Sequence, residues 1–64
     1  MTEIREKAEH FVQDAMRQGF TRKQSVEIAM YGVDKIINHA KLDRDDLIYW
    51  FEVMDYLESI QLSK

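Results

Sequence analysis

The chain has 64 residues, no cysteine or proline, and a formal net charge of −3 at pH 7 from 12 acidic and 9 basic residues. This length allows one domain at most, close to the lower limit for a chain that folds alone, and the lack of cysteine excludes stabilising disulfides. No stretch approaches the ~20 apolar residues of a membrane span, and the first ten residues contain no apolar signal core. We therefore expect a cytoplasmic protein that makes no membrane contact.

The first predicted helix covers residues 3–18. Its apolar residues recur at helical spacing on one face, and charged residues occupy the opposite face. The apolar set is Ile4, Ala8, Phe11, Val12, Ala15 and Met16. Gly19 follows this pattern, and glycine commonly ends a helix because it adopts a positive φ without strain.

A second helix is predicted over residues 22–40. Thr21 and Gln24 have the spacing of a capping box, in which each side chain accepts a hydrogen bond from the other residue's backbone N–H, and Phe20 directly precedes the cap. An apolar stripe follows, made of Val26, Ala29, Met30, Val33, Ile36, Ile37 and Ala40. Ile28 and Tyr31 point away from that stripe.

The third predicted helix covers residues 44–61, with Asp43 as its N-cap. Its sequence from residue 47 onward, LIYWFEVMDYLESIQL, places apolar side chains around roughly two thirds of the helix circumference. A helix of this kind needs more than one neighbour to cover it. The fold class is therefore all-α, a small three-helix bundle or a helical hairpin plus a third helix, completed by dimerisation.

Two faces of the third helix receive different assignments. The first is a core face formed by Leu47, Trp50, Phe51, Met54 and Leu57, and Phe11 and Phe20 are also expected in the core. The second is a ridge formed by Tyr49, Val53, Tyr56 and Ile60, which together with Trp50 is expected to contact a partner or a second copy. Tyrosine and tryptophan are enriched at binding hot spots because they bury a large area at low entropic cost.

The sequence contains no motif for catalysis, for a cofactor or for a metal. The run from Asp43 to Asp46 has the acidic start of a calcium loop, but the positions that require glycine and glutamate hold Ile48 and Met54. His10 and His39 have no second ligand at metal-binding spacing. We therefore expect neither enzyme activity nor a bound cofactor.

The remaining interpretation is a protein–protein interaction module, an accessory or inhibitory regulator of a partner that the sequence does not identify, acting as a homodimer. Glu52, Asp55 and Glu58 make the third helix acidic, which disfavours contact with a phosphate backbone. One alternative is a small DNA-binding regulator with a helix-turn-helix-like second helix, which starts with Arg22 and Lys23. Another is an acidic nucleic-acid mimic that blocks a basic groove.

Overall fold

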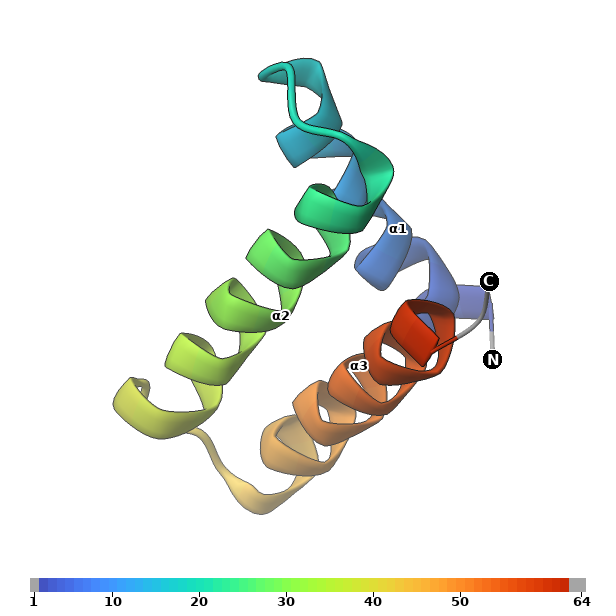
Figure 1. The fold of residues 1–64 in the computed structure, drawn as a ribbon. Coiled ribbons are helices and arrows are strands. Elements are labelled where there is room, and N and C mark those ends of the chain that lie inside the picture. Colours follow the sequence, from blue (N-terminus) through green and yellow to red (C-terminus); the bar gives the residue numbers. More distant parts are fainter. Residues whose placement is uncertain (1, 63–64) are drawn as a thin grey trace.

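The computed structural model describes residues 2–62, which form three helices joined by two short connections (Figure 1). The helices are α1 (Thr2–Arg17), α2 (Arg22–His39) and α3 (Arg44–Leu62), so each predicted boundary is correct to within one residue. In Figure 1, α2 and α3 run in opposite directions on either side of the second connection. Each helix packs against both others, and the prediction of an all-α three-helix bundle is confirmed.

Local interactions at the helix ends explain these boundaries. Gly19 follows α1 with a φ of +102°, a conformation that side chains with a Cβ rarely adopt. The Thr21–Gln24 capping box is present: the Gln24 backbone N–H donates to Thr21 Oγ1 at 3.2 Å, and the Thr21 N–H donates to Gln24 Oε1 at 3.0 Å. Asp43 caps α3 by accepting a hydrogen bond from the Asp46 N–H at 2.9 Å.

The fully buried core consists mainly of small side chains. Its hydrophobic members are Ala8, Val12, Ala15, Val26, Ala29, Val33, Val53 and Leu57. Aromatic rings lie at the margin of this core: Phe11 and Trp50, both half-buried, meet edge to face with ring centroids 6.0 Å apart. The centre of the bundle is thus filled by alanine and valine side chains and Leu57, and the aromatic rings pack around it.

The rotation of α3 about its own axis differs from the sequence prediction. Val53, predicted on the outer ridge, is fully buried, whereas Phe51, predicted in the core, is 50% exposed. The predictions for Val53 and Phe51 are therefore wrong, as is the core assignment of Phe20, which is 42% exposed. The side of α3 that meets α1 and α2 is centred on Val53 and Leu57. Relative to the predicted face, the helix is rotated about its own axis by just under ~100°, the angle between consecutive residues of an α-helix.

Ser25 is an exception within the core. Its side chain is fully buried, and its Oγ has no hydrogen-bond partner among the described residues. Because an unpaired buried hydroxyl costs about 1–3 kcal/mol, Ser25→Ala should stabilise the fold by about 1 kcal/mol and raise the thermal midpoint by roughly 4–8 °C. Thermal unfolding followed by far-UV circular dichroism measures this change.

Ser59→Ala is the matched control, because the Ser59 hydroxyl is exposed and donates to the Tyr56 carbonyl at 2.8 Å. Its midpoint should stay close to that of the wild type. A midpoint for Ser25→Ala that equals or falls below the wild-type value would contradict an unsatisfied hydroxyl at this position.

Candidate functional site

The predicted ridge of α3 packs mostly within the molecule. Tyr49 contacts Trp50 edge to face with a centroid separation of 5.3 Å, and the Tyr56 hydroxyl donates to Glu9 Oε2 at 3.2 Å. Ile60 is also half-buried against the core, and Val53 has no exposed surface to offer to a partner. Partner contact through the half-exposed Tyr49, Trp50, Tyr56 and Ile60 stays a prediction.

Glu9 on α1 joins the other two helices. The same Oε2 atom that accepts from Tyr56 of α3 lies 3.2 Å from Arg22 Nη2 at the start of α2. Arg22 was a candidate DNA contact in the helix-turn-helix interpretation. In the structure its guanidinium is held against a carboxylate of the same chain.

A mixed apolar and acidic surface lies on the opposite side of α3 from the core. We define the α3 outer face as five exposed residues: Ile48, Phe51, Glu52, Asp55 and Glu58. Ile48 is 48% exposed and Phe51 is 50% exposed, and both share this side of the helix with Asp55. No salt bridge within the described residues involves any of the three carboxylates. The outer face thus combines apolar area with unpaired negative charge.

The sequence prediction placed the three acids correctly on an exposed surface but missed Ile48 and Phe51. A usable signal was present, because Asp55 falls between Ile48 and Phe51 in helical projection. Charged residues mark the solvent side of a helix more reliably than apolar residues mark its core side. The position of Asp55 therefore indicated which apolar residues face outward.

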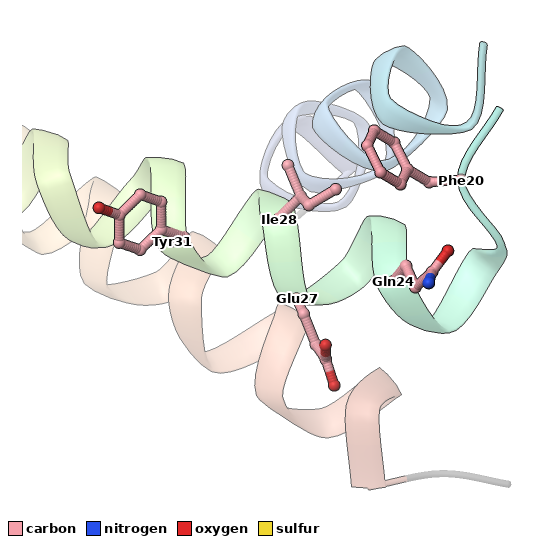
Figure 2. Close-up of a pocket in the computed structure, with 5 residues that line it drawn as sticks. All are labelled: Phe20, Gln24, Glu27, Ile28 and Tyr31. Atoms are coloured by element: carbon pink, nitrogen blue, oxygen red, sulfur yellow. The ribbon is translucent and has the colours of Figure 1, made fainter. Parts of the chain in front are cut away.

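A second exposed surface lies on α2 and the connection before it. A hollow of about 330 Å³ is lined by Phe20, Gln24, Glu27, Ile28 and Tyr31. Figure 2 shows Ile28 beside Phe20, with Tyr31 further along α2. Ile28 is 41% exposed and Tyr31 is 64% exposed, which confirms the prediction that both point away from the core stripe. We refer to these five residues as the α2 outer face.

A second hollow, of about 460 Å³, is polar and lies between α1 and α3. Its lining residues are Glu3, Glu6, Lys7, His10 and Tyr49. Burial raises the pKa of the Tyr49 hydroxyl above its ordinary value of 10.0, and the negative charge of Glu3 raises it further. Tyr49 is therefore protonated at neutral pH.

The described residues offer neither a metal site nor a membrane-spanning helix. Within residues 2–62, no group of three or more His, Asp or Glu side chains is arranged to hold a metal ion. None of the three helices combines the length and the apolar character needed to cross a bilayer.

Comparisons with protein-family models, curated proteins and solved structures found no match to this chain. The function is therefore inferred from the exposed surfaces of the chain itself.

Proposed function

We propose that this chain is a non-catalytic protein-binding module, an accessory or inhibitory regulator that binds a basic protein surface through the α3 outer face. One observation carries the proposal: Ile48 and Phe51 are about half exposed on the same face as three carboxylates that form no salt bridge within residues 2–62. An aromatic side chain surrounded by unpaired charge resembles the centre and rim of a protein interface.

The apolar and acidic residues have different roles in this proposal. Phe51 and Ile48 fill an apolar groove on the partner. Binding removes their exposed apolar surface from water, which stabilises the complex. Glu52, Asp55 and Glu58 attract a positively charged partner over a distance of about one Debye length, ~8 Å at physiological salt. The acids therefore set mainly the association rate, and the apolar residues set mainly the dissociation rate.

The charge of this face also argues against a second copy as its occupant. A symmetric pairing of two α3 outer faces would bring the three carboxylates of each copy together, and Arg44, at the start of the helix, is the one base of α3 on that side within the described residues. Like charges opposed across an interface are destabilising. A partner whose apolar groove is bordered by lysine or arginine matches both the apolar and the acidic residues of this face.

To identify the partner, a photo-crosslinking phenylalanine analogue replaces Phe51 in the full chain, which is then irradiated in an extract of the native host. The matched control carries the same analogue in place of Tyr31, on α2. We expect a basic protein crosslinked from position 51 and not from position 31. Lack of a specific adduct at position 51 would contradict the proposal.

Binding kinetics with the purified partner then test the mechanism. The triple variant Glu52→Gln, Asp55→Asn, Glu58→Gln should associate several-fold more slowly at low ionic strength, with little difference at ~0.5 M salt. Phe51→Ala should increase the dissociation rate at least tenfold, equivalent to about 1.4 kcal/mol. Wild-type rates for both variants at every salt concentration would rule out the α3 outer face as the binding surface.

In a more specific form of this proposal, the partner's basic surface is a nucleic-acid-binding groove, and the chain blocks it as an acidic mimic of nucleic acid. The six acids from residue 42 onward, against Arg44 and Lys64 as the only bases there, favour this version. Competition distinguishes the two: DNA or RNA should displace the chain from such a groove in a salt-dependent manner. Direct DNA binding by α2 is not proposed, because Arg22 is paired with Glu9 and the exposed lysines of α2, Lys23 and Lys35, are offset by the exposed acids Glu27 and Asp34.

A further inference from the structure

The α2 outer face has the geometry of a helix-packing site. Gln24, Glu27, Ile28 and Tyr31 line the hollow and are spaced i, i+3, i+4 and i+7 along α2. Four residues at this spacing form the hole that receives one side chain of a facing helix in knobs-into-holes packing. Phe20, from the connection before α2, closes one end of the same hollow (Figure 2).

The hollow is apolar with one negative group. Phe20, Ile28 and Tyr31 supply exposed apolar surface, and the Glu27 carboxylate is exposed and makes no salt bridge within the described residues. The side chain that fits such a hole has an apolar stem and a cationic end. Lysine meets both requirements, because its methylene stem packs on apolar groups while its ammonium pairs with a carboxylate.

Lys35 lies on the same side of α2, one turn beyond Tyr31. Its Nζ lies 5.0 Å from the centre of the Tyr31 ring, so the cation is already at the edge of the α2 outer face. Glu27 and Lys35 are thus separated from Tyr31 by four residues in opposite directions. When two copies of α2 pack antiparallel about Tyr31, Lys35 of each copy approaches the hole that contains Glu27 of the other.

We infer that the α2 outer face is a homodimer interface, in which the α2 helices of two copies pack antiparallel and Lys35 of each enters the Glu27-containing hollow of the other. The argument is self-complementarity: one face carries both the acid and the base, with apolar side chains between them, as a two-fold interface requires. The charged residues of the α3 outer face are three acids, with Arg44 as the single base on that side of the helix, and this face shares no residue with the α2 outer face, so we assign the two faces to different occupants.

Sedimentation equilibrium of the full chain between ~1 and ~200 µM tests the inference. We expect a reversible monomer–dimer equilibrium for the wild type and a monomer of 7.7 kDa for Ile28→Asp, which places a charge in the apolar part of the interface. Phe51→Asp on the α3 outer face is the matched control and should dimerise like the wild type. Far-UV circular dichroism checks that each variant keeps its helices.

Charge exchange tests the pairing itself. Glu27→Lys and Lys35→Glu, each alone, should weaken dimerisation at least tenfold. The double variant should recover most of it, and an equimolar mixture of the two single variants should form the mixed dimer. Recovery is expected because opposite charges again face one another across the two-fold axis.

A wild-type chain that stays monomeric at ~200 µM would overturn the inference. So would a dimer that Phe51→Asp disrupts and Ile28→Asp leaves intact, because that result would place the interface on α3. Failure of the charge-exchange pair to restore association would reject the antiparallel arrangement. None of these outcomes depends on the partner proposed for the α3 outer face.

Discussion

Val53→Asp should leave the chain largely unfolded at pH 7, the largest effect that we expect from any single substitution. Val53 is fully buried where α3 meets the core residues of α1 and α2. A carboxylate at this position would have no cation within reach, and an unpaired buried charge costs several kcal/mol, comparable to the whole stability of a small domain. Far-UV circular dichroism and Trp50 fluorescence at pH 7 measure the loss.

The same variant should regain helicity as the pH is lowered. Burial raises the pKa of the introduced carboxyl above its unfolded value of about 3.9, so the folded state binds the proton more tightly than the unfolded state. Stability is therefore greatest below the unfolded pKa and falls as the pH rises through the folded pKa. Ile48→Asp, on the α3 outer face, introduces the same charge at an exposed position and should fold normally at pH 7. Equal unfolding of both variants would contradict the rotation of α3.

Leu57→Ala should cost about 2–5 kcal/mol of unfolding free energy, through lost burial and the cavity that remains. Leu57 is the largest of the fully buried side chains, and it lies one turn after Val53 on the core side of α3. In a core made mainly of valine and alanine, few neighbours are large or flexible enough to fill the space. Urea unfolding at one fixed protein concentration measures the change, since the proposed dimerisation would make stability concentration-dependent.

Phe51→Ala is the informative comparison for Leu57→Ala. Phe51 is the larger residue, but half of its side chain is exposed, and alanine has the higher helix propensity. We expect it to cost no more than about 1 kcal/mol. A loss of stability equal to that of Leu57→Ala would mean that Phe51 lies in the core, as the sequence pattern first indicated.

The helix boundaries could be predicted because local interactions set them. Gly19 ends the first helical pattern, Thr21 and Gln24 satisfy each other's backbone groups, and Asp43 accepts from the Asp46 N–H. Each of these interactions spans only a few residues. They can therefore be predicted from the sequence without knowledge of what the helix packs against.

The core faces of α1 and α2 could also be predicted, because apolar and charged residues lie on different sides of both helices. Ala8 and Val12 on α1, and Val26 and Val33 on α2, were predicted to face inward, and all four are buried. The second exposed surface followed in part from the same pattern, since Ile28 and Tyr31 fall outside the apolar stripe of α2. The exposure of Phe20 was not predicted. Its position directly before the Thr21 cap is the same whether the ring packs into the core or lies at the surface beside the α2 hollow.

Only the tertiary structure decided how α3 is rotated, and with it which residues are available to a partner. Apolar side chains surround most of that helix, so the sequence pattern alone does not select a core side. The selection comes from the neighbours: Val53 and Leu57 are the α3 side chains that pack fully against the alanine and valine side chains of α1 and α2. Phe51 is excluded to the surface beside Asp55. The sequence by itself determined three capped helices and an acidic third helix, and close packing determined that Ile48 and Phe51 accompany those acids on the outer face.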